Sequence, residues 1–273
     1  DSRTTDESTV AKSVKIDVGK PQLESGSIVF TTSNTGNDDD PDLENVLLAL
    51  GQETIHMDFE TNERVETPSV KINGTETGVS VSKGVDAADV EDSTGKKWRA
   101  SYLVTDTADV SEVTFEISNF NDPAGNTNTL DSRTTDESTV AKSVKIDVTD
   151  PYVILSSLES SNSSQPGTEL SGYQLAKSSE KITLKFETSE RVEIPDALTI
   201  NGQSEIPVTS QTDDTTGKKW EAFYTVNDTI DVSDVTFNIV GFSDPSGNTI
   251  STNPPNNYVN TTSDSSKVYI DVS

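Results

Sequence analysis

The stretch Lys145-Ile146-Asp147-Val148-Thr149-Asp150-Pro151 sets the organisation that we predict for this chain. Val144 and Ile146 alternate with polar residues, which is typical of the end of a β-strand. Two carboxylates follow at a spacing of three, and the proline after them resists strand pairing and favours an extended linker. The stretch therefore predicts a rigid joint between two β-domains, and its paired acids suggest that a divalent cation holds the joint.

An internal repeat gives the domain organisation. Residues 1–18 recur letter for letter at 131–148, and the run Phe59–Glu66 matches Phe186–Glu193. Further matched runs are Ile72–Gly74 with Ile200–Gly202, Thr94–Trp98 with Thr216–Trp220, and Asn121–Asn126 with Ser243–Asn248. This period is far above the roughly 20–50 residues of solenoids and predicts tandem domains. With boundaries at the prolines, 1–18 is the terminal strand of a preceding domain, followed by domains 19–148 and 149–273. The alternative phase starts each unit at Asp1 and Asp131.

Short segments with period-two alternation predict an all-β fold of tandem immunoglobulin-like β-sandwich domains that form an elongated rod. We expect about seven strands per domain, A to G, at 21 or 151 onward, 54–60 or 181–187, 69–73 or 197–201, 78–82 or 206–210, 97–104 or 219–226, 112–119 or 234–241, and 140–148 or 267–272. Trp98 and Trp220 are predicted core residues, and both Asn-Gly pairs are predicted hairpin turns. The stretches 32–45 and 156–172 are predicted loops, with one helical turn at Asp42–Leu50 as an alternative.

Composition excludes several classes of function. The 273 residues carry a net charge of −27, which disfavours nucleic acid and anionic membrane surfaces as partners. Without cysteine there is no disulfide framework, and a single histidine, His56, rules out a zinc cluster. We expect no enzymatic activity, because a catalytic triad would depend on this one outward-facing residue. The 30% hydrophobic content is compatible with disorder, but the regular alternation favours thin sandwiches instead. No membrane-spanning run or signal peptide is evident, and we expect an excised piece of a longer chain.

The direction of the strands predicts which acidic loops meet at the joint. The B–C and F–G loops of the second domain, the E–F loop and strand G of the first, and the linker all converge there. Calcium prefers six to eight oxygen ligands, which such loops supply. The predicted ligands at this joint are Asp147, Asp150, Glu187, Glu190, Asp244, Asn248, Asp106 and Asp109. The counterparts at the preceding joint are Asp17, Glu60, Asp122 and Asn126.

Two observations keep other interpretations open. Acidic residues are common in solvated turns, because Asp and Asn suit turn conformations. Lys20 replaces Asp150 at the first joint, where its ammonium group either substitutes for the cation or weakens its binding. The run Asp38-Asp39-Asp40-Pro41-Asp42 has no counterpart in the second domain, and we interpret it as a solvated loop, with a separate cation site as the alternative.

The ordered set of motifs resembles a known family. The Val-x-Ile-Asp-Val-x-Asp-Pro joint, the Phe-Glu-x-Ser/Asn-Glu-x-Val run, the tryptophan strand and the closing Asp-Pro-Ser/Ala-Gly-Asn are similar to the bacterial immunoglobulin-like repeats of giant, type-I-secreted, non-fimbrial adhesins. The resemblance spans nearly the whole chain. It implies a calcium-stiffened rod of repeats, secreted and displayed at the bacterial cell surface, with a role in virulence. It implies cation ligation by Asp147, Asp150, Glu187, Asp244 and Asn248.

The function expected from this reading is that of a calcium-stiffened spacer in a surface adhesin that mediates attachment to host cells. The alternative is a recognition module that binds a host glycan or receptor through the stretches 32–45 or 156–172. The expected partners are neighbouring repeats of the same chain and a host cell-surface glycan or receptor, with binding of the receptor by other domains as the alternative. We expect a monomer that neither binds nucleic acid nor inserts into a membrane.

Overall fold

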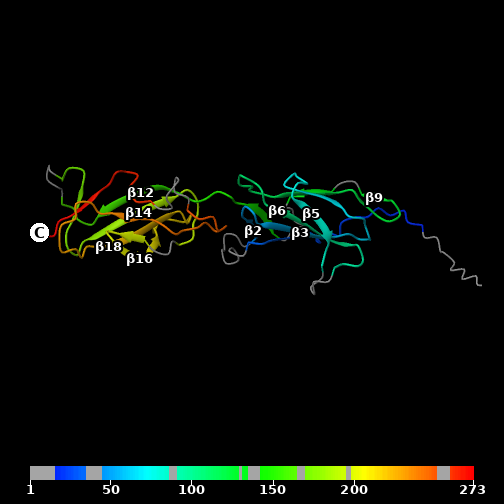
Figure 1. Cartoon of the computed structure of the whole chain (residues 1–273), viewed down its shortest axis with the longest axis horizontal. Helices are drawn as coiled ribbons and strands as arrows, with labels where there is room; N and C mark the ends of the chain where they lie inside the picture. The colour runs from blue at the N-terminus through cyan, green and yellow to red at the C-terminus, as the bar shows by residue number, and fades with distance from the viewer. Residues whose placement is uncertain are drawn as a thin grey trace, which may run out of the picture. The chain divides into compact units, whose positions relative to one another are not determined.

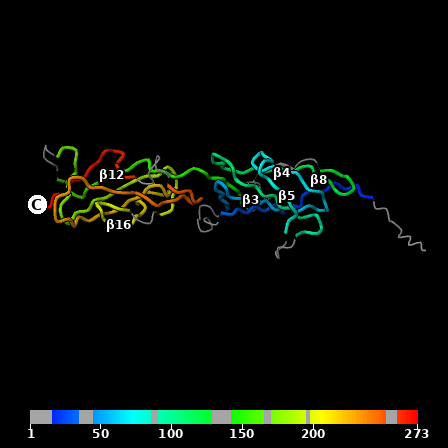
Figure 2. Tube along the Cα trace, viewed as in Figure 1, coloured from blue at the N-terminus to red at the C-terminus, as the bar shows by residue number. Residues whose placement is uncertain are grey.

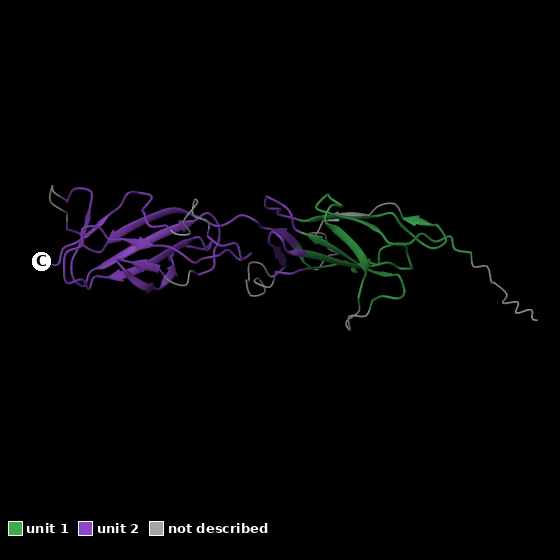
Figure 3. Ribbon diagram, in the orientation of Figure 1, with its two compact units in different colours: residues 1–31, 55–103, 113–143 green, residues 32–54, 104–112, 144–273 purple. Residues whose placement is uncertain are grey.

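The computed structural model describes residues 16–34, 45–85, 91–128, 131–134, 142–164, 170–194, 198–250 and 259–273, and for 131–134 the backbone only. These residues form two compact units (Figure 3). Unit 1 consists of 1–31, 55–103 and 113–143, and unit 2 of 32–54, 104–112 and 144–273. The predicted domain boundaries after residues 18 and 148 rest on the repeat and stay a prediction.

Unit 1 is built mainly from two antiparallel sheets. The first has the order β1 (Val29–Thr32), β3 (Thr54–Glu60), β6 (Lys97–Leu103) and β5 (Val79–Lys83). The second has the order β10 (Asp131–Thr134), β7 (Thr114–Ser118) and β4 (Ser69–Ile72), and β8 (Phe120–Asn121) pairs with β9 (Thr127–Asn128). The rings of Phe30 and Phe115 lie 5.5 Å apart, so residues of the two sheets share one core.

Unit 2 has the same plan of two main sheets, and it adds the strand pair β13 (Gln174–Ala176) and β20 (Val268–Ile270) (Figure 1). Its four-stranded sheet has the order β12 (Val153–Ser160), β14 (Lys181–Thr188), β18 (Lys219–Thr225) and β17 (Val208–Ser210). The opposing sheet has the order β16 (Gln203–Ile206), β15 (Leu198–Ile200) and β19 (Phe237–Asn238). The pair of β13 and β20 is parallel. These are the A-B-E-D order and the A′–G pairing of immunoglobulin-like sandwiches.

A further strand pair in unit 2 joins segments that are far apart in the sequence. β2 (Val46–Ala49) lies beside β11 (Ser143–Ile146), as the trace in Figure 2 allows the reader to follow. Residues 46–49 are therefore extended, and the helical turn considered for Asp42–Leu50 is absent from its described part, 45–50. Residues 38–42 lie outside the described residues.

The alternation of apolar residues predicts the core well. Ile182, Leu184 and Phe186 of β14 are buried, while Lys181, Thr183 and Lys185 between them are not. Trp98 and Trp220 are buried as predicted. The all-β, immunoglobulin-like fold is thereby confirmed. No helix among the described residues is long and apolar enough to cross a membrane.

The prediction of an irregular loop at 156–172 was partly wrong. β12 continues through it to Ser160, because Ser156 and Leu158 bury their side chains while Ser157 and Glu159 do not. Strand F of the second domain, predicted at 234–241, is only two residues long in β19. His56 lies on the outer side of β3 as predicted, but it is half-buried and its Nδ1 lies 2.8 Å from Ser101 Oγ.

Turn chemistry fixes the register of the hairpins. Asn73 and Gly74 have φ of 51° and 75°, and Asn201 and Gly202 have φ of 49° and 75°. Positive φ at both central positions defines a type I′ turn, for which Asn-Gly is the preferred pair. Both predicted hairpin turns are confirmed.

A carboxylate organises the turn before the tryptophan strand in each unit. Asp214 accepts hydrogen bonds from Thr216 N and Oγ1 at 2.9 and 2.6 Å, and from Lys218 N and Lys219 N at 3.1 and 3.2 Å. Burial raises the pKa of Asp214, but the bonds from Thr216, Lys219 and Lys218 outweigh it and lower the pKa to about 2. Asp92 makes the equivalent bonds in unit 1, and its pKa is also lowered.

This turn leads to a test of pH dependence. A carboxylate with a lowered folded-state pKa stabilises the fold above its unfolded pKa, and that contribution is lost as the pH falls through the folded pKa. We expect Asp214→Asn to lower the melting temperature at pH 7, and the deficit to shrink as the pH falls from about 5 to about 2. Calorimetric melting of both proteins across this range measures it, with the exposed Glu205→Gln as control. A deficit that is constant with pH contradicts this role.

Candidate metal centre

The candidate metal centre in unit 2 is built on the tight loop Asp244–Asn248. Asp244 N and Asn248 O form a hydrogen bond of 3.0 Å that closes the loop. One carboxylate oxygen of Asp244 accepts bonds from Gly247 N at 2.7 Å and Asn248 N at 2.9 Å, and the other accepts one from Asn248 Nδ2 at 2.9 Å. Gly247 has φ of 102°, which residues with a side chain rarely adopt. The motif Asp-Pro-Ser-Gly-Asn therefore buries one carboxylate in a fixed orientation.

The same loop holds the end of β11. Asn248 Nδ2 donates to the backbone oxygen of Asp147 at 3.1 Å, and Ser246 Oγ donates to the Asp147 carboxylate at 2.8 Å. Ser246 is almost fully buried. Asn34 Nδ2 in turn donates to Ser246 O at 2.7 Å. These neutral donors bring two carboxylates together from positions that are 97 residues apart, from 147 to 244.

A third carboxylate, Glu190, completes the group. It follows the end of β14, where Thr188 Oγ1 donates to Glu190 O at 2.6 Å. Oxygen atoms of Asp147, Glu190 and Asp244 all lie within 4.8 Å of one another. Two bare charges about 4 Å apart repel by roughly 1 kcal/mol in water and about 4 kcal/mol at an effective dielectric constant of 20. The group is therefore costly while it is ionised and lacks a cation.

The pKa values of all three acids are raised, in keeping with this repulsion. Burial, followed by the charges of Asp147 and Asp244, raises the pKa of Glu190 to about 7. Burial, opposed by the Asn248 amide and assisted by the Asp147 charge, raises the pKa of Asp244 to about 6. Burial also raises the pKa of Asp147, to which the charge of Asp109 adds. Lys218 lowers the pKa of Glu190 but does not offset these effects, so positive charge near the three acids would lower their pKa values.

Asp109 supports the group from the 104–112 segment of unit 2. Its carboxylate accepts hydrogen bonds from Val148 N at 2.9 Å, Thr149 N at 3.1 Å and Thr149 Oγ1 at 3.0 Å. It thereby fixes the backbone that follows Asp147. Its negative charge adds to the field of the group without being one of the three closely placed carboxylates.

Unit 1 holds a second group with the same plan. Oxygen atoms of Asp17, Glu63 and Asp122 lie within 4.8 Å of one another. Asn126 Nδ2 donates to Asp122 at 2.8 Å and to the backbone oxygen of Asp17 at 3.2 Å, as Asn248 does in unit 2. Ala124 stands in the place of Ser246, so the loop offers no side-chain hydroxyl to Asp17. The Asn126 hydrogen bond lowers the pKa of Asp122, in contrast to the raised pKa of Asp244.

The structure brings together some of the predicted ligands and not others. Asp147, Glu190 and Asp244 form one group with Asn248 bonded to it and Asp109 beside it, and Asp17 and Asp122 belong to the other with Asn126. Glu187, Asp150, Asp106 and Glu60 are outside both groups. Sequence reasoning missed Glu63. The signal for it was available, because Glu63 matches Glu190 in the runs Phe59–Glu66 and Phe186–Glu193.

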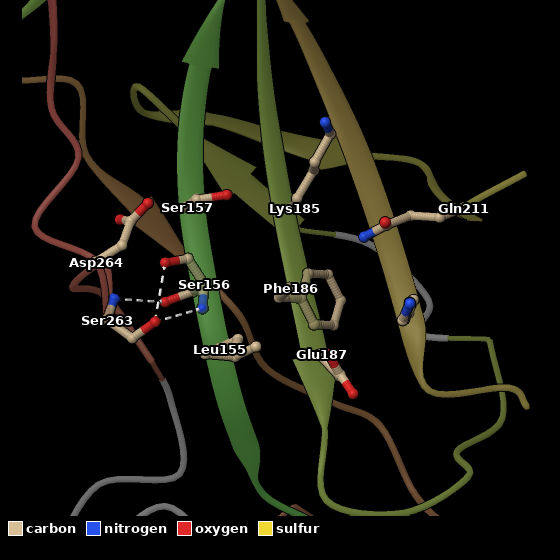
Figure 4. Close-up of a pocket in the computed structure, with 10 residues that line it drawn as sticks. Leu155, Ser156, Ser157, Lys185, Phe186, Glu187, Gln211, Ser263 and Asp264 are labelled. Carbon is tan, nitrogen blue, oxygen red and sulfur yellow. Dashed lines mark hydrogen bonds between the residues drawn. The ribbon is translucent and has the colours of Figure 1, made fainter. Parts of the chain in front are cut away.

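Strand position explains why Glu187 is outside the group. It still belongs to β14, where it pairs with Leu155 on one side and Lys219 on the other. Figure 4 shows Glu187 beside Leu155 on the sheet, where both line a shallow pocket of about 290 Å³ together with Lys185 and Gln211. Asp228, the counterpart of Asp106, accepts a hydrogen bond from Tyr224 Oη at 2.6 Å, which indicates a structural role for that position.

The set of donors fits a hard cation. Three carboxylates supply only oxygen atoms, which calcium and magnesium prefer, and the loops around them place backbone and amide oxygens nearby. The described residues offer no histidine or cysteine to either group. The residues that would hold the cation in unit 2 are Asp147, Glu190 and Asp244.

Comparison with known proteins gives similarity at the level of the fold. No family model matches the chain, and no curated protein matches it. Solved structures that are similar include the I-band fragment I67–I69 from titin, with 10% identity over 93% of this chain and a TM-score of 0.41. Rst D1-D2 has 10% identity over 93% of this chain and all of its own length, with a TM-score of 0.32. The chain spans 66% of the titin fragment.

The raised pKa values lead to a prediction for the cation-free protein. An acid with a raised folded-state pKa stabilises the fold below its unfolded pKa, and this contribution is lost as the pH rises through the folded pKa. Without calcium, we expect the melting temperature to fall between about pH 5 and about pH 8, where Glu190 and Asp244 ionise. Glu190→Gln flattens this slope, and the exposed Glu193→Gln does not. Thermal melting in calcium-free buffer measures both, and equal slopes in the two variants contradict the account.

Proposed function

We propose that this chain is a calcium-stabilised segment of immunoglobulin-like repeats in a bacterial surface adhesin. The observation that supports cation binding is that oxygen atoms of three carboxylates lie within 4.8 Å of one another in each unit. Beside them, an asparagine amide donates a hydrogen bond to the backbone. The adhesin role, secretion to the cell surface and a part in host attachment rest on the sequence resemblance. A structural role, rather than catalysis, is the function that these features support.

The cation stiffens the chain through its place in unit 2. Asp147 and Asp109 lie on segments 144–273 and 104–112, close to residues 104, 112 and 144, where the chain passes between the units. Glu190 and Asp244 belong to the sandwich of β12 to β20. A bound cation pulls Asp147 towards Glu190 and Asp244, and Asp109 follows through its bonds to Val148 and Thr149. Loss of the cation frees these segments and lets repulsion separate them.

Calcium titration by calorimetry tests this proposal. We expect binding with a Kd of about 10⁻⁴–10⁻³ M, as in extracellular modules. Glu190→Gln and Asp244→Asn should each weaken the unit 2 site at least about tenfold, because a carboxylate ligand is lost. Glu187→Gln is the matched control, because Glu187 lies three residues away on β14 and outside the group. Absence of binding heat, or an equal loss in Glu187→Gln, sinks the proposed site.

Small-angle scattering separates stiffening from binding. In calcium, we expect a narrow distribution of interatomic distances, and in chelator a broader one with a changed maximum dimension. Glu190→Gln in calcium should resemble the wild type in chelator. Calcium binding without any change in scattering would support the cation site but contradict the stiffening role.

A further inference from the structure

The strand β12 is an edge strand, and its outer backbone groups are nevertheless paired. The sheet order places β12 at one end, with β14 as its strand neighbour among the described residues. Edge strands with free backbone groups invite pairing with another chain. Tyr152, just before this strand, and Ile154 and Leu155, near its start, are 51%, 42% and 55% exposed, which adds apolar surface there. Protection of this edge therefore has a physical purpose.

Two serines of the 263–266 turn pair with the outer side of β12. Ser156 N donates to Ser263 Oγ at 2.8 Å, and Ser263 N donates to Ser156 O at 3.0 Å (Figure 4). Leu158 N donates to Ser266 Oγ at 2.7 Å. Ser156 is only 4% exposed, which is low for an edge strand. The turn thus satisfies three backbone groups, one of them through its own backbone.

The side-chain amide of Gln174 pairs with the backbone of Leu158 and Ser160 as a peptide group of a neighbouring strand would. Its Nε2 donates to Leu158 O at 2.9 Å, and its Oε1 accepts from Ser160 N at 2.9 Å. One amide thereby accepts and donates as a residue of a neighbouring strand would. Ser160 Oγ also donates to Leu175 O at 2.6 Å, which holds β12 against the backbone of β13.

We propose that Gln174, Ser263 and Ser266 form an edge cap that blocks strand addition by a second copy of this chain. Strand addition between two copies pairs β12 with β12, which gives a symmetric interface of the kind common in homodimers. It needs Ser156, Leu158 and Ser160 to be free, and the cap occupies the hydrogen-bonding groups of all three. The first repeat has Leu47 in the position of Gln174, so this cap belongs to the second repeat.

The test is the triple variant Gln174→Leu/Ser263→Ala/Ser266→Ala in the full 273-residue chain. The matched control is Gln203→Leu/Ser157→Ala, which changes the same residue types on exposed or outer positions of the same unit. Near-ultraviolet circular dichroism, to which the buried Trp98 and Trp220 both contribute, verifies that both variants are folded. We expect the amides of Ser156, Leu158 and Ser160 to exchange with deuterium about two- to tenfold faster in the triple variant, because each loses a hydrogen bond of about 0.5–1.5 kcal/mol.

Sedimentation velocity then measures association. We expect the triple variant to form dimers or larger species at concentrations where the wild type and the control stay monomeric. Unchanged exchange overturns the cap, and faster exchange in a protein that stays monomeric overturns its role against strand addition. If the triple variant does not fold, Ser266→Ala and Gln174→Leu are measured singly by the same two methods, and the same outcomes decide.

Discussion

Three carboxylates that lie within 4.8 Å of one another are the constraint on which this structure depends. Their repulsion opposes the compact fold unless a cation or protons neutralise them. What holds them in place is a set of neutral donors: Ser246 and Asn248 bind Asp147, and the backbone of the 244–248 loop binds Asp244. These hydrogen bonds hold the three acids close together without a cation, so a hard cation such as calcium would find its ligands already in place.

The two groups share a plan but differ in electrostatics. In unit 2, Ser246 Oγ reaches the Asp147 carboxylate, and burial raises the pKa values of all three acids. In unit 1, Ala124 makes no such bond, and the Asn126 hydrogen bond lowers the pKa of Asp122. The alanine at position 124, which lacks the hydroxyl of Ser246, is one of the sequence differences that accompany this different balance of burial and hydrogen bonding.

Much of the fold followed from local rules, and the parts that did not depend on tertiary contacts. Period-two alternation located β14 and β18, and Asn-Gly located the I′ turns. The expected direction of the strands placed Asp147, Asp244 and Asn248 at one joint. It did not separate Glu187 from Glu190, because that choice depends on β14 ending at Thr188. The serine-rich sequence of β12 also looked like a loop, since its hydroxyl partners in 261–266 lie about 100 residues away in sequence.

The most direct measurement is a crystal structure grown in calcium, with diffraction data collected where calcium scatters anomalously. The account predicts an anomalous peak among Asp147, Glu190 and Asp244, with oxygen atoms at about 2.3–2.6 Å from it. Density without a peak there, with Glu190 turned into solvent and Lys218 or a proton as its only partner, would contradict the account.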